Sequence, residues 1–71
     1  MSKMRNNPRI IVTVSDNGVN CKGVYIDSKD NVNSFNRQFN YEYQAFEVLD
    51  TMKYENDCEF SIQINRINWK G

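Results

Sequence analysis

Residues 40–54, NYEYQAFEVLDTMKY, form the one long stretch of the chain with a helical spacing of apolar side chains. Asparagine is among the residues preferred at a helix N-cap, and Asn40 stands at that place. Five side chains fall within an arc of roughly 100° at the helical period, namely Tyr41, Ala45, Val48, Leu49 and Met52. The stretch therefore predicts one helix whose apolar stripe covers a sheet.

Alternating side chains upstream of this helix predict a β-hairpin. Residues 9–15, RIIVTVS, alternate apolar with more polar side chains, as a strand does. The turn DNG at 16–18 sets the register of a second strand, at about 20–27. A two-residue Asn-Gly loop would put Val24 and Ile26 on the face opposite to the apolar side chains of the first strand. We favour a three-residue loop with its glycine left-handed, because it gives one continuous apolar face of Ile10, Val12, Val14, Val24 and Ile26.

Two further strands complete the predicted sheet. After a turn, a strand over 32–39 adds Phe35 and Phe39 to the apolar face, and alternation over 58–64 predicts a fourth strand that bulges or ends near Arg66. The order β-β-β-α-β indicates the α+β class, with an antiparallel four-stranded sheet and one helix packed on one face. The other face should be mostly polar and wet, with Ile11, Thr13, Ser15, Tyr25, Ser34, Asn36 and Gln38.

The chain has 71 residues, enough for one domain. Residues 1–8 are polar, lack periodicity and end in proline, so we interpret 1–8 as a disordered arm and 9–71 as a single α+β domain. A core of this size gives little surplus stability, so a partner subunit would help, and we expect a homodimer.

The sequence indicates neither a metal-binding site nor a membrane-spanning segment. The sequence has no histidine, and Cys21 and Cys58 lack the spacing of metal ligands, so we expect neither metal nor cofactor. One disulfide between the two cysteines is compatible with the sequence, but we expect free thiols in a reducing cytoplasm. The longest apolar run, 10–14, is too short to span a bilayer.

Charge balances to zero but is unevenly placed. Residues 42–59 hold six acidic side chains and one basic one, whereas residues 1–41 hold six basic and three acidic ones. The helix side should therefore be acidic and the strands mildly basic. A nucleic-acid-binding protein usually has a stronger basic excess, so nucleic acid is the less favoured partner.

Two short motifs resemble the N-terminal half of the ribonuclease H-like fold, which also runs β-β-β-α-β. VTVSDNG at 12–18 is similar to that family's first strand, and YEYQAFEVLDTM at 41–52 is similar to its helix. The resemblance implies that Asp16 and Glu42 stand where the family holds magnesium. The family's next metal-binding aspartate corresponds to Asn65, and two-metal hydrolysis needs several carboxylates. We therefore interpret Glu42 as a charge that opposes the helix dipole, with no catalytic role.

Candidate protein-binding residues lie on the second face of the helix. Tyr43, Phe46, Asp50 and Tyr54 follow the spacing i, i+3, i+7, i+11, and aromatic side chains are enriched at protein interfaces. Alternatively, Phe46 covers the flank of the sheet while the tyrosine hydroxyls stay in water. Trp69 either anchors a partner or closes one end of the core.

The missing histidine removes the usual general base, and we expect no enzyme. The leading hypothesis is a non-enzymatic protein that occupies a surface of another protein. In type it resembles small accessory proteins of bacteriophages, some of which inhibit host defence, toxin or nuclease components, and this implies the host cytoplasm. The alternatives are a self-assembling structural subunit or a nucleic-acid-binding module that uses Lys22, Arg37, Arg66 and Lys70.

Overall fold

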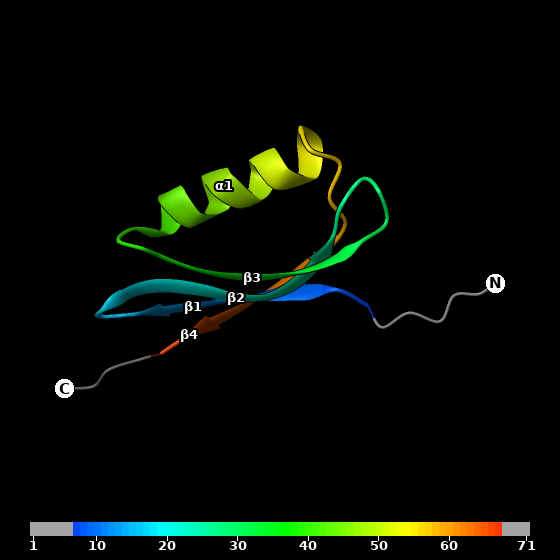
Figure 1. The fold of residues 1–71 in the computed structure, drawn as a ribbon. Helices are drawn as coiled ribbons and strands as arrows, with labels where there is room; N and C mark the ends of the chain where they lie inside the picture. The colour runs from blue at the N-terminus through cyan, green and yellow to red at the C-terminus, as the bar shows by residue number, and fades with distance from the viewer. Residues whose placement is uncertain (1–6, 68–71) are drawn as a thin grey trace.

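One helix covers one face of a four-stranded sheet (Figure 1). The computed structural model describes residues 7–67. Its elements follow the predicted order: β1 (Arg9–Ser15), β2 (Gly18–Ile26), β3 (Val32–Phe39), α1 (Glu42–Tyr54) and β4 (Ser61–Arg66). The predicted α+β class and the single helix over one sheet face are confirmed.

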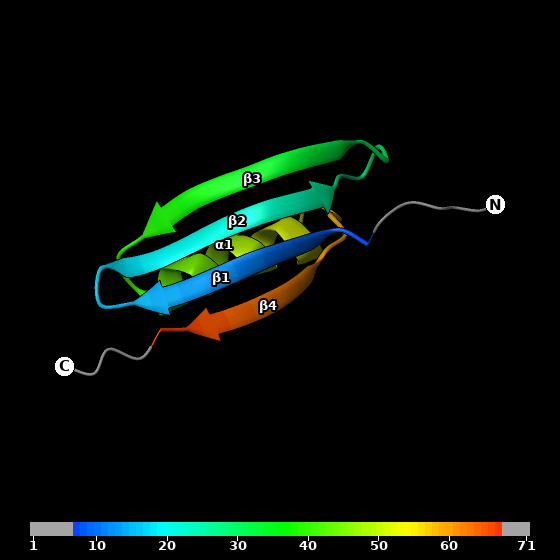
Figure 2. The ribbon, with the colours of Figure 1, turned by 90° about the horizontal axis from the view of Figure 1, so that it is seen from below.

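The sheet is mixed, so the prediction of a fully antiparallel sheet is wrong. Its strand order is β3-β2-β1-β4, with β4 parallel to β1 (Figure 2). The physical reason is chain direction. Two hairpins give β1 and β3 the same direction, and α1 returns the chain once more, so that β4 runs the same way as both. Placed beside β1, it can only pair in parallel.

The first hairpin has a two-residue turn, so the predicted three-residue loop is also wrong. Ser15 pairs with Gly18, which leaves Asp16 and Asn17 alone in the turn. Gly18 has φ +124°, and a Cβ there would lie 2.9 Å from the carbonyl oxygen of Phe39. Glycine at this point lets β2 begin one residue earlier than the loop that we favoured.

This register exchanges the two faces of β2. Val19 and Cys21 pair with Val14 and Val12 and lie under the helix, whereas Val24 lies on the open face. Tyr25, predicted for the open face, lies on the helix side. There its ring meets that of Phe35 edge to face, 6.1 Å between centroids.

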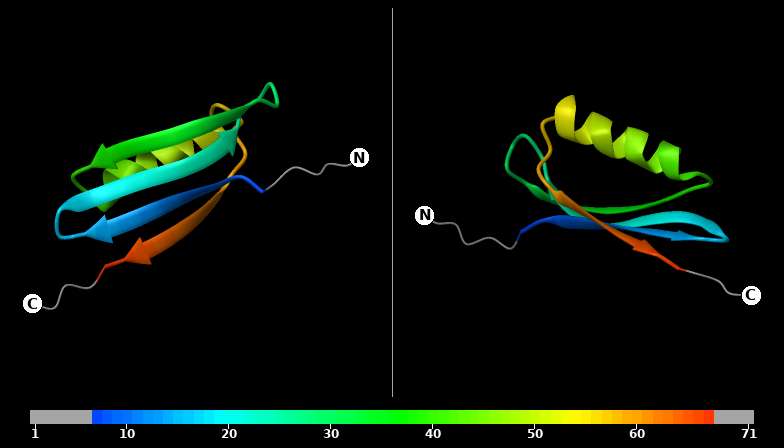
Figure 3. Two further views of the ribbon diagram at one scale, coloured as in Figure 1. Left: turned by 60° about the horizontal axis from the view of Figure 1, so that its bottom comes forward. Right: turned by 180° about the vertical axis from the view of Figure 1, so that it is seen from behind.

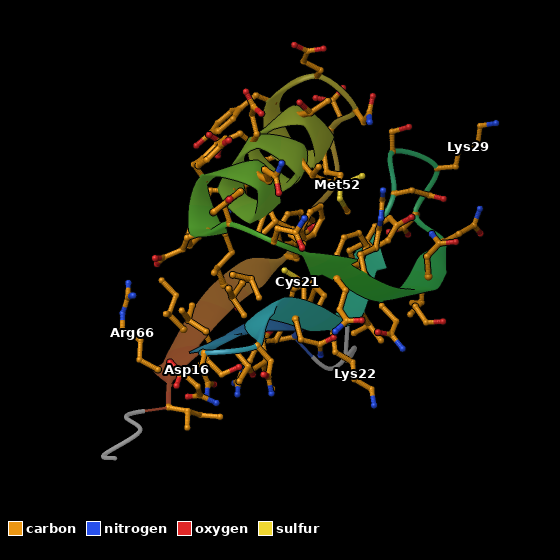
Figure 4. All side chains as sticks on the ribbon, turned by 90° about the vertical axis from the view of Figure 1, so that its left-hand side faces the viewer. Asp16, Cys21, Lys22, Lys29, Met52 and Arg66 are labelled. Atoms are coloured by element: carbon orange, nitrogen blue, oxygen red, sulfur yellow. The ribbon has the colours of Figure 1, made fainter. Side chains whose placement is uncertain are left out.

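The core lies between α1 and the sheet. Figure 4 shows Met52 and Cys21 there, and Lys22 pointing away from the helix. Phe35 joins the apolar face as predicted, and Phe39 packs against it. The buried members are Ile10, Val12, Val19, Cys21, Phe35, Ala45, Leu49, Met52 and Phe60.

The start of the helix differs from the prediction. Tyr41, not Asn40, is the N-cap, and it has an extended backbone with φ −133° and ψ 150°. The side-chain oxygen of Gln44 accepts the backbone N–H groups of Asn40 and Tyr41, both at 3.3 Å. Tyr41 therefore lies outside the first turn, and its side chain is exposed, not buried in the predicted stripe.

The fourth strand begins at Ser61, later than the predicted Cys58, and ends at Arg66 as predicted. Pro8, which we assigned to the arm, is buried beside it. The Pro8 carbonyl accepts the N–H of Ser61 at 3.0 Å and its hydroxyl at 3.3 Å. The fold therefore includes this last residue of the predicted arm.

Gly23 permits the close approach of β2 to β1. A Cβ at this position would lie 2.7 Å from the Cα of Ile10 and closer still to the carbonyl oxygen of Arg9. Both are backbone atoms of β1, so relief of the clash requires the two strands to move apart.

We expect Gly23→Ala to lower the free energy of unfolding by about 1–3 kcal/mol in urea denaturation. The neighbouring exposed change Lys22→Ala should stay within about 0.5 kcal/mol, and equal effects would contradict this account.

Asp27 organises the turn between β2 and β3. Its carboxylate accepts the backbone N–H groups of Lys29 and Asn31, both at 2.9 Å, and the side-chain amide of Asn33 at 3.0 Å. The hydrogen bonds from Asn31 and Asn33 lower the pKa of Asp27 below its ordinary value of 3.8. The backbone hydrogen bond from Lys29 and the positive charge of that side chain lower it further. Since the folded state favours the ionised form, this contribution to stability is present above that value. It is lost as pH falls through the lowered pKa.

We therefore expect the melting temperature of wild type to exceed that of Asp27→Asn at neutral pH, and the difference to shrink below about pH 4. Asn33→Ala should raise the pKa of Asp27 in a carboxyl NMR titration. An unchanged difference at low pH would show that the carboxylate charge is irrelevant to this turn.

Candidate functional site

The side of α1 that faces away from the sheet carries exposed tyrosines. Tyr43 and Tyr54 are 65% and 77% exposed, and Asp50 lies between them on the same side of the helix. The ring of Tyr41 stacks on that of Tyr43, 5.7 Å between centroids and 11° between planes. Glu47 is exposed on this side as well. We call Tyr41, Tyr43, Glu47, Asp50 and Tyr54 the outer tyrosine face.

This face arises from the helical period. Ala45, Leu49 and Met52 are buried against the sheet, and residues half a turn away must point to solvent. Phe46 is the exception among the predicted binding residues, because it is half-buried and packs against the core. Its position fits the alternative that we left open, in which it covers the flank of the sheet. Tyr41 was missed because we placed it in the buried stripe.

Glu42 forms an ion pair with Arg66. The Oε2 atom of Glu42 lies 2.7 Å from Nη2 of Arg66, and the two side chains are 35% and 60% exposed. Glu42 is in the first turn of α1, where its charge also opposes the helix dipole. The parallel pairing of β4 with β1 brings Arg66 close to Glu42. The one sequence signal for this contact was the spacing of two residues that puts Arg66 on the same face of the strand as Ile62 and Ile64.

Residues 7–67 contain no cluster of ligands that would support the magnesium site implied by the ribonuclease H-like resemblance. Asp16 is an exposed turn residue, and Glu42 is engaged by a cation. Among residues 7–67, no three acidic or cysteine side chains are grouped closely enough to hold a metal ion. The donor set of this part of the chain therefore does not fit a two-metal centre.

The basic residues of the nucleic-acid alternative point in different directions. Lys22 lies on the open face of the sheet, where it pairs across the strands with Ile11 and Asn36. Arg37 lies on the helix side, and its guanidinium is 5.5 Å from the ring centroid of Phe39. Arg66 is engaged by Glu42, and Figure 4 shows Lys22 and Arg66 well apart. Trp69 and Lys70 lie outside the described residues.

A groove between α1 and β3 was not predicted. Two adjoining hollows share Glu47 and Val48 on the helix side. Tyr25, Phe35 and Met52 line the more apolar of the two. The correct register of β2 was the missing information, since only that register brings Tyr25 beneath the helix.

Neither cysteine is set up as a nucleophile. Both are free thiols, with Cys21 buried and Cys58 half-buried. Burial raises the pKa of each, and the charges of Asp27 and Asp57 raise that of Cys58 further. Since the thiolate is the reactive form, both side chains are poor nucleophiles at neutral pH.

Comparison of the chain with protein-family models, with curated proteins and with solved structures gives no match. Within residues 7–67, α1 does not have the length and apolar character that crossing a bilayer requires.

The ion pair predicts the behaviour of Glu42→Gln. Exposed pairs contribute about 0.2–1 kcal/mol, so we expect a loss of that size in urea denaturation, and a similar loss for Arg66→Gln. The double variant should cost little more than either single one, because both remove the same contact. Millimolar magnesium should leave the melting temperature of wild type unchanged. A magnesium-dependent rise that Glu42→Gln abolishes would restore the metal hypothesis.

Proposed function

We propose that this chain is a small non-enzymatic binding protein that occupies a surface of another protein through the outer tyrosine face. The observation that carries the proposal is the exposure of Tyr43 and Tyr54, on a helix whose opposite side is buried in the core. Tyrosine gives a large contact area with few rotatable bonds, and its hydroxyl can bond to the partner. Because the helix is already formed and packed on the sheet, binding requires little ordering of the chain.

The charge of the face indicates the chemistry of the partner. Glu47 and Asp50 stand between the two tyrosines, and the chain after the helix carries three more exposed acidic residues, Glu55, Asp57 and Glu59. A partner surface with apolar pockets rimmed by lysine and arginine would complement it. The resemblance in type to phage accessory proteins makes a host defence, toxin or nuclease component the first class to test.

A Tyr43→Ser/Tyr54→Ser double variant tests the proposal. Both side chains are exposed, so circular dichroism and melting temperature should stay near those of wild type. In a pull-down from bacterial lysate treated with nuclease, a protein captured by wild type should be lost with this variant. Removing two interface tyrosines should weaken its binding by about tenfold or more.

The matched control is Val32→Ser, because Val32 is equally exposed but lies on β3, away from the outer tyrosine face. It should retain the captured protein. Equal capture by wild type and the tyrosine double variant would exclude this face. Capture that disappears with nuclease treatment would favour the nucleic-acid alternative.

A further inference from the structure

Among residues 7–67, no strand pairs with the outer edge of β4, and we call this the free edge of β4. On its paired side, the N–H groups of Ser61 and Ile67 donate to the carbonyls of Pro8 and Val14, at 3.0 and 2.9 Å. Backbone groups of successive strand residues point to opposite edges. The N–H and C=O groups of Ile62, Ile64 and Arg66 therefore point to the free edge.

The side chains of the same three residues lie on the helix side of the sheet. Ile62, Ile64 and Arg66 pair in register with Ile10, Val12 and Val14, whose side chains belong to the core or pack against it. The helix does not extend over β4 (Figures 2 and 3), and Ile64 is 44% exposed. The apolar layer thus continues beyond the part of the sheet that the helix covers. It reaches an edge with which no strand within residues 7–67 pairs.

We propose that a second copy of this chain pairs with the free edge of β4, antiparallel and about a two-fold axis at Ile64. In this register Ile64 faces the partner's Ile64, and Ile62 faces the partner's Arg66. These are the residues whose N–H and C=O groups point outward, so every outward group of the three finds a complement. On the open face Gln63 would meet the partner's Asn65, a polar pair.

Charge also favours a second copy at this edge. Arg66 is the one charged residue of β4, and Glu42 of the same chain neutralises it. The two-fold register brings no like charges directly opposite each other, which would destabilise a strand pair. An edge strand is usually protected by charge, proline or a bulge, and residues 61–65 have no charge and no proline.

The other free edge, β3, is a poorer candidate. Its central aromatic side chain, Phe35, is already buried beneath α1, so pairing there would cover less new apolar surface. Arg37 also stands within β3. Pairing through β4 would instead extend the apolar layer of a small core across two chains.

The first test is the oligomeric state by light scattering and sedimentation across a range of concentrations. We expect wild type to dimerise and Ile64→Lys to weaken the dimer by about tenfold or more, because two lysines would meet at the axis. Val32→Lys is the matched control, since Val32 is an exposed residue on the β3 edge, and it should leave the dimer intact. A monomeric wild type, or a dimer that Ile64→Lys leaves unchanged, would overturn the proposal.

The second test does not depend on how well Ile64→Lys folds. Facing residues of a hydrogen-bonded antiparallel pair have Cα atoms about 5.5 Å apart, within the range of a disulfide. In a Cys58→Ser background, Ile64→Cys should therefore form a covalent dimer on mild oxidation, whereas Val32→Cys should not. Cross-linking through Val32→Cys alone would place the interface at β3 and contradict the proposal.

Discussion

The parallel pairing of β4 with β1 is the constraint on which the rest of the structure depends. It gives β1 a neighbour on both sides, and this central strand supplies Ile10 and Val12, which have no exposed surface. The same pairing brings Arg66 to Glu42. Parallel strands need a long connection, and between β1 and β4 it consists of β2, β3 and α1. The ion pair and the position of the free edge beyond β1 both follow from where β4 is inserted.

The sequence predicts the elements of this fold better than their arrangement. Helix and strands follow from the period of apolar side chains, which is a local property. The turn at residues 16–18 was not decided by that property, because a shift of one residue exchanges the faces of β2 and still leaves apolar residues on both. The direction of β4 depends on which edge of the sheet it joins. That choice is settled by contacts between Ile10 and Ile62, far apart in the chain.

The candidate site shows the same division. Tyr43, Asp50 and Tyr54 could be placed on the outer side of the helix because the period alone determines their direction. Phe46 could not, since its burial depends on how far the flank of the helix lies over the sheet. The groove beside β3 requires the correct register of β2, so reasoning from local pattern could not find it. Residues at the limits of an element, such as Tyr41, are the least determined by periodicity.

The distance in sequence between β1 and β4 has a consequence during synthesis. β1, β2 and β3 leave the ribosome first, and their hairpins join neighbouring segments that can pair early. The second edge of β1 must wait for residues 61–66, which are translated after β2, β3 and α1. Until then β1 is an edge strand of the nascent sheet, and unpaired strand edges are where chaperones and unrelated strands bind. The interval between the emergence of β1 and that of β4 therefore sets how long this edge of the nascent chain stays open.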